Sequence, residues 1–148
     1  MSEAIEAERS FVDEFPDEAR VVRAALLSSF FALTLGAVFG IVQTLHRTDV
    51  ARIIPSTDYY TVLTAHGVFM VISFTIFFLV GLFTWAVTRS LNRPLVDVRI
   101  TWTWYAIMAV GMTMTGVSIL AGFFPALDMS ADVLFTFYAP LQAHPLFY

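Results

Sequence analysis

Three long stretches without Asp, Glu, Lys or Arg constrain the fold more than any other feature. They run from Ala24 to Val42, from Tyr59 to Thr88 and from Ile100 to Leu127. A helix needs about 20 apolar residues to cross a bilayer. Helices satisfy their own backbone groups in lipid, and none of the stretches alternates like a strand. We therefore expect an all-α membrane protein with three full transmembrane helices, at about residues 21–43, 59–88 and 100–124.

The composition supports a bilayer environment and excludes several kinds of chemistry. Of the 148 residues, 58% are hydrophobic and only 14% are charged, against about 25% in soluble domains. The net charge is −4 and Lys is absent, so we expect no nucleic-acid partner. Cys is also absent, which excludes disulfides, thiolate nucleophiles, iron–sulfur ligation and covalent attachment of c-type haem.

The two ends of the chain differ from the apolar stretches. Residues 1–18 are strongly acidic and do not resemble a secretory signal, so we expect a solvated acidic arm ahead of a transmembrane domain over residues 19–148. A fourth apolar stretch begins at Val133 and is interrupted by Pro140 and Pro145. We expect a fourth span to begin at about residue 140, and the chain to be a truncated sequence that ends soon after that start.

Arginines in the short connections predict the orientation. The connection between the second and third spans carries Arg89, Arg93 and Arg99 against Asp97, and the connection after the third span has only acidic charges. Basic loops stay in the cytoplasm. We therefore expect the acidic arm and the N-terminus to be cytoplasmic.

His66 is the ionisable residue that lies deepest in an apolar stretch. It lies seven residues after Tyr59, roughly 10 Å along the helix. An ionisable group at that depth is costly and suggests a function. A neutral imidazole can serve as an axial ligand of haem iron. A histidine that packs against a neighbouring helix is the alternative, and the residues alone leave both open.

Three glycines are relevant to the interpretation of His66. Gly67 leaves room beside the imidazole for a flat macrocycle, although close helix packing would also explain it. Gly36 and Gly40 form a small-xxx-small pattern that favours helix packing over contact with a cofactor. Four more residues share the face of His66 at helical spacing: Tyr59, Leu63, Met70 and Ser73.

The other candidates for chemistry are weak. His144 precedes Pro145 and could contact propionates or water near the surface, or be a solvated loop residue. His46 receives no role. The three stretches contain no Asp or Glu, and no phosphate loop or Ser-His-Asp set is present. We expect no catalytic residue in this chain.

Two motifs resemble a known family. Tyr59 to Met70 reads YYTVLTAHGVFM, which resembles helix II of subunit I in the haem-copper oxidase superfamily, with its Leu-Thr-x-His-Gly signature. Phe135 to Tyr148 reads FTFYAPLQAHPLFY, which resembles the Thr-Phe-Tyr-x-Pro-Leu stretch before helix IV of the B-type branch. The loop from Arg89 to Arg99 does not resemble the Asn- and Asp-bearing loop of A-type oxidases. The resemblance covers nearly the whole chain.

The resemblance implies an N-terminal fragment of a cytochrome c oxidase subunit I, a bundle of twelve or more helices. It implies that His66 is an axial ligand of the low-spin haem iron and that Gly67 lies at the same cofactor. The high-spin haem and copper belong to the full-length protein, whose ligands for them lie on later helices. This fragment would then lack the oxygen-reducing site.

The same resemblance implies aerobic respiration, with electron transfer to oxygen coupled to proton translocation in the full-length enzyme. Expected partners are membrane lipid, a subunit II, and cytochrome c or a small copper protein as electron donor. The expected location is the plasma membrane of a prokaryote. Two alternatives remain: a nitric-oxide reductase of the same superfamily, and a cofactor-free membrane scaffold protein in which His66 only packs.

Overall fold

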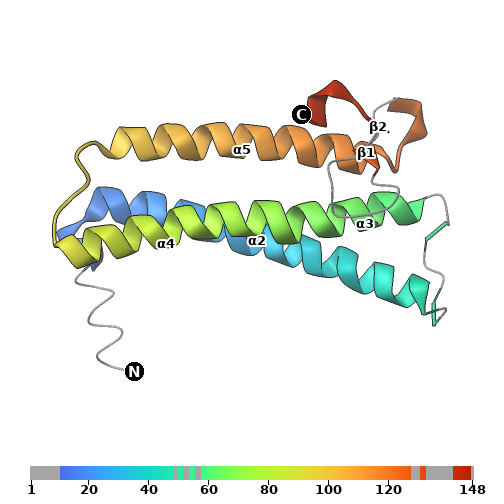
Figure 1. Cartoon of the computed structure of the whole chain (residues 1–148), viewed down its shortest axis with the longest axis horizontal. Helices are drawn as coiled ribbons and strands as arrows, with labels where there is room; N and C mark the ends of the chain where they lie inside the picture. The colour runs from blue at the N-terminus through green and yellow to red at the C-terminus, as the bar shows by residue number, and fades with distance from the viewer. Residues whose placement is uncertain are drawn as a thin grey trace.

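Three long helices dominate the fold. The computed structural model describes residues 11–48, 50–51, 54–55, 58–127, 131–132 and 142–147. Helix α2 covers Pro16–Arg47, and α5 covers Val98–Ala121. The second span is continuous and consists of α3 (Tyr59–Gly67), a π-helix η2 (Val68–Ser73) and α4 (Phe74–Leu91). All three are long and apolar enough to cross a membrane. The predicted all-α architecture with three helices of membrane-spanning length is confirmed (Figure 1).

Short elements follow α5. A 3-10 turn, η3 (Pro125–Leu127), precedes β1 (Ala131–Asp132), which pairs antiparallel with β2 (Gln142–Ala143) over two residues. A second 3-10 turn, η4, covers Pro145–Phe147, a few residues after the predicted start of a fourth span at about residue 140. Residues 133–141 and Tyr148 lie outside the described residues, so the fourth span stays a prediction.

The acidic arm needs a correction. Residues 11–14 are already helical, and the side chains of Phe11 and Phe15 are 5% and 7% exposed because they pack with Ala19 and Val22. The expected solvated arm, residues 1–18, is therefore shorter at its C-terminal end. The two phenylalanines explain the difference, since their apolar area is buried against α2. Residues 1–10 lie outside the described residues.

A buried carboxylate joins the start of α2 to the connection between α4 and α5. Glu18 is only 4% exposed, and its Oε1 accepts a hydrogen bond from the backbone N–H of Leu95 at 2.8 Å. The connection is shaped by two more local features. Asn92 ends α4 in the left-handed conformation (φ 48°), which Asn tolerates well, and Asp97 caps α5 by accepting from the Arg99 N–H.

The buried core draws on all three spans. One cluster contains Ala32 from α2, Ala65, Val68 and Phe69 from the second span, and Ile119 from α5. Many other large apolar side chains point outward, and Leu27, Phe31 and Trp104 are each more than 60% exposed. Such exposure suits a chain whose surroundings are lipid tails and other helices.

The π-helix changes the face predicted for one residue. A π-turn bonds residue i to i+5 and so shifts the side chains that follow it. The Ser73 hydroxyl donates to the Val68 carbonyl at 3.1 Å and lies 3.5 Å from Met112 Sδ on α5. Ser73 therefore faces α5, whereas His66 and Met70 face α2. Regular helical spacing placed Ser73 on the face of His66, and that expectation is wrong.

Replacing Glu18 tests the contact between α2 and the α4–α5 connection. In Glu18→Ala the part-buried Leu95 N–H loses its acceptor, so we expect the free energy of unfolding to fall by about 1–3 kcal/mol. Asp17→Ala is the matched control, because Asp17 lies in the same turn, is exposed and, among the described residues, pairs with exposed Arg20. Its loss should stay below about 1 kcal/mol. Denaturant unfolding in detergent measures both, and equal losses would contradict the assignment.

Candidate functional site around His66

A hydrogen bond to the backbone of α2 orients His66. The residue lies in the last turn of α3, and its Nδ1 is 2.8 Å from the Gly36 carbonyl oxygen. A carbonyl can only accept, so Nδ1 carries the proton and donates. In a neutral imidazole the lone pair then resides on Nε2. That nitrogen has no hydrogen-bond partner among the described residues.

Two glycines of α2 make the approach of the second span possible. A Cβ atom at Gly40 would lie 2.8 Å from both Cε1 and Nδ1 of His66. A Cβ atom at Gly36 would lie 2.5 Å from Cγ of Met70. Real Cβ contacts are not that short, so the imidazole and Met70 occupy the space that the two missing side chains leave. The packing interpretation of the small-xxx-small pattern is confirmed.

Gly67 is different, because it faces open space. A Cβ atom added there would meet no heavy atom of the described chain within 4 Å. Close packing within this chain therefore does not require a glycine at position 67. The role of Gly67 in cofactor binding stays a prediction.

Three stacked aromatic rings lie next to this arrangement. Phe39 precedes Gly40 on α2, and its ring stacks on Phe69 at 6.3 Å and on Phe123 at 6.4 Å, both with interplanar angles of 11°. The sequence analysis did not single out these residues. Their contacts join α2, η2 and the segment after α5, and no spacing along one helix could indicate a stack built from three segments.

The other histidines do not join His66 in a metal site. His144 Nδ1 accepts the backbone N–H of Leu146 at 3.2 Å, which stabilises the local turn at η4. The His46 ring tilts against Tyr59 with a centroid distance of 5.5 Å. Across the described part of the chain, no group of three His, Cys, Asp or Glu residues could hold a metal ion. The site offers one imidazole nitrogen, which fits an axial ligand of a cofactor metal.

Comparison with known proteins identifies the family. Residues 20–148, which include His66, most of α2 and the whole of the other two spans, match the family model described as Cytochrome C and Quinol oxidase polypeptide I. The chain is also 32% identical over 150 residues to the cytochrome c oxidase subunit 1 of Thermus thermophilus. The chain belongs to this oxidase family.

The match covers 96% of this oxidase chain and 25% of the relative, so the chain spans about a quarter of the relative's length. No solved structure matches. The predicted membership of the haem-copper oxidase superfamily is confirmed at the level of oxidase polypeptide I.

Enlarging Gly40 tests the geometry of His66 without reference to any cofactor. In Gly40→Ala the new methyl group overlaps the imidazole, so the ring must move and the Nδ1–Gly36 hydrogen bond must lengthen or break. We expect the ¹⁵N chemical shifts of labelled His66 to indicate a single Nδ1–H tautomer in the wild type and a mixture of the two neutral tautomers in the variant. Gly111→Ala is the control, because a Cβ atom there, unlike one at Gly40, meets open space. An unchanged His66 spectrum in Gly40→Ala would contradict this packing.

Proposed function

We propose that this chain forms the N-terminal part of the catalytic subunit of a terminal respiratory haem-copper oxidase of the B-type branch, and that His66 is an axial ligand of its low-spin haem. One observation carries the proposal. The Nδ1–H donates to the Gly36 carbonyl, so the lone pair on Nε2 is left to bind iron. The family match and the relative's name support the oxidase part of the proposal.

The residues around His66 have separate tasks in this proposal. When bound, the low-spin haem would supply reversible one-electron transfer. The Gly36 carbonyl holds the ring in one tautomer and raises the basicity of Nε2, as hydrogen-bonded partners of metal-binding histidines do. Buried Ala65 and Phe69 keep water away on the protein side, and a dry environment shifts the potential of a haem.

Gly67 would complete the site on its open side. It directly follows His66, and the volume where its side chain would project is empty in the described chain. A macrocycle that approaches Nε2 needs such a volume beside the imidazole. We assign Gly67 to the haem-binding surface for this reason.

The whole enzyme would use residues outside this chain. We propose a cytochrome c or a small copper protein as electron donor, a subunit II as partner, and oxygen as acceptor, with proton translocation coupled to the reaction. The high-spin haem and copper would be held by later helices. The arginines of the α4–α5 connection support a cytoplasmic N-terminus in a prokaryotic plasma membrane. The relative's name favours an oxidase over a nitric-oxide reductase.

Removing the imidazole tests the ligand assignment. In the full-length subunit, we expect His66→Ala to lose the low-spin haem band from the reduced-minus-oxidised spectrum, because alanine offers no donor atom. His46→Ala is the matched control: it removes a histidine near the same end of the bundle and should keep the band. A variant His66→Ala with the wild-type low-spin spectrum would falsify the assignment.

Filling the space at Gly67 tests the shape of the site. We expect Gly67→Leu to lower low-spin haem content at least tenfold, because the side chain enters the volume assigned to the macrocycle. Gly111→Leu also places a side chain in open space and should bind haem normally. Haem content per subunit, from pyridine haemochrome spectra, measures both. Full haem occupancy in Gly67→Leu would show that Gly67 does not belong to the haem-binding surface.

A further inference from the structure

The π-helix η2 begins only two residues after His66, at Val68. Each i→i+5 bond of a π-helix encloses one residue more than the i→i+4 bond of an α-helix. A π-helix inside a longer helix therefore absorbs one extra residue and rotates everything after it relative to everything before it. Such turns are rare and are frequently found at functional sites.

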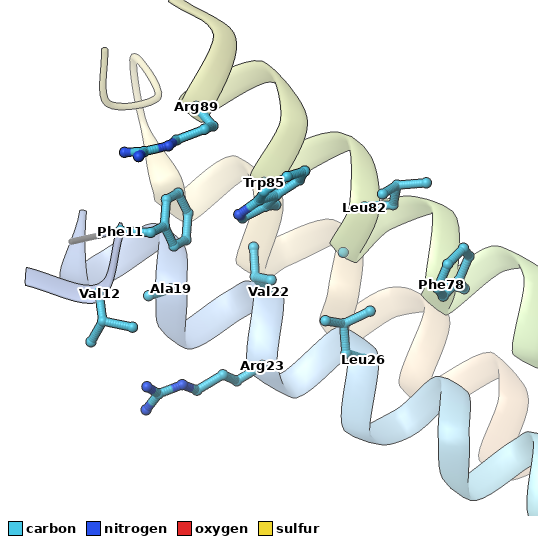
Figure 2. A pocket seen from close by; sticks show the side chains of 11 residues that line it. Phe11, Val12, Ala19, Val22, Arg23, Leu26, Phe78, Leu82, Trp85 and Arg89 are labelled. Carbon is cyan, nitrogen blue, oxygen red and sulfur yellow. The ribbon is translucent and has the colours of Figure 1, made fainter. Parts of the chain in front are cut away.

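The extra residue brings the two halves of the second span onto one face. At about 100° per residue, a regular α-helix would place Phe78 about 120° and Trp85 about 100° away from His66 around the axis. With one residue absorbed by η2, both lie within about 20° of His66. The structure agrees, because His66 packs on Gly40 of α2, and Phe78 and Trp85 line an apolar groove between α4 and α2 (Figure 2).

The same rotation explains which residues of the second span contact α5. A regular α-helix would place Ser73 and Phe77 within about 20° of His66, and absorbing one residue moves them about 120° and 80° away. Ser73 Oγ lies 3.5 Å from Met112 Sδ, and the Phe77 ring meets the Tyr105 ring at a centroid distance of 5.7 Å. Both partners belong to α5, so α4 is packed on α2 and α5 at once.

Ser73 makes a hydrogen bond that only the π geometry allows. Its side chain is 2% exposed, and its hydroxyl donates to the carbonyl of Val68, five residues earlier, at 3.1 Å. In an α-helix a serine hydroxyl donates to a carbonyl three or four residues earlier. Ser118 does so in α5, where it bonds the Thr115 carbonyl. The hydroxyl of Ser73 thus joins the first and last residues of η2 and stabilises it against a regular α-helix.

We propose that Ser73 is a positioning residue for His66, because it stabilises the π-helix that turns the imidazole toward α2. The proposal rests on the proposed function of His66 as a haem ligand. If η2 became α-helical, one half of the span would have to rotate by about 100°. The half with α4 has 18 helical residues packed on two helices, whereas α3 has nine. The α3 half would therefore rotate and take His66 away from the Gly36 carbonyl.

Removing the hydroxyl tests the role of Ser73. In the full-length enzyme in detergent, we expect Ser73→Ala to speed transfer of the low-spin haem to apomyoglobin about fivefold, which corresponds to about 1 kcal/mol for one hydrogen bond. In haem-depleted enzyme, the ¹⁵N chemical shifts of labelled His66 should show both neutral tautomers. Ser73→Thr keeps a hydroxyl and should resemble the wild type. Ser118→Ala is the matched control, because it removes a buried serine hydroxyl that bonds within α5.

Deleting Ile72 tests the register. The deletion removes the extra residue, and the Ile72 side chain is 46% exposed, so little packing within the chain is lost. We expect the span to become a regular α-helix that still directs His66 to α2 and retains the haem. Ser73→Ala should then have no further effect in this background, because no π-helix needs support.

Thermal unfolding verifies that each variant folds. Equal effects of Ser73→Ala with and without Ile72 would show that the hydroxyl only supports packing, and would overturn the proposal. So would equal effects of Ser73→Ala and Ser118→Ala, a comparison that decides the matter if the deletion does not fold. Low-spin haem retained in His66→Ala would contradict the proposed function instead, and the ¹⁵N measurement would still test how Ser73 acts on the imidazole.

Discussion

The close approach of α2 to the second span is the constraint on which the rest of the structure depends. It is possible because Gly36 and Gly40 have no side chains where Met70 and His66 lie. In a bilayer the hydrophobic effect does not drive two helices together, so close van der Waals packing and interhelical hydrogen bonds must do so. The bond from His66 to the Gly36 carbonyl supplies both a contact and an orientation, and it exists only because the backbones are close.

The spans could be predicted from the sequence, and their interactions could not. Long stretches without charge identify membrane helices because the bilayer excludes other solutions. His66 also stood out, because an ionisable group is costly there. Its partner, however, is 30 residues away on another helix, and a backbone carbonyl leaves no signature in a sequence. The π-helix at Val68–Ser73 was equally hidden, since its residues are ordinary apolar ones.

At the acidic end, composition alone did not show which residues would be buried. Seven acidic residues within the first 18 suggested an arm in water. Phe11 and Phe15 outweigh that charge locally, because burying each ring gains about 1.5–3 kcal/mol. The same end of the bundle holds the contact of Glu18 with Leu95, and Phe11 also lines the groove between α2 and α4. The arm is therefore part of the architecture of that end of the bundle.

The hydrogen bonding of the two ring nitrogens of His66 bears on whether the residue packs against a helix or binds a metal. A histidine retained for packing gains from hydrogen bonds at both ring nitrogens, because each unpaired polar atom in lipid is costly. Here Nδ1 is bonded to α2, and Nε2 has no partner among the described residues. At that depth the bilayer offers Nε2 no donor. In the proposed function an electron-pair acceptor such as haem iron would occupy Nε2, so the hydrogen bond at Nδ1 is compatible with a ligand as well as with a packing residue.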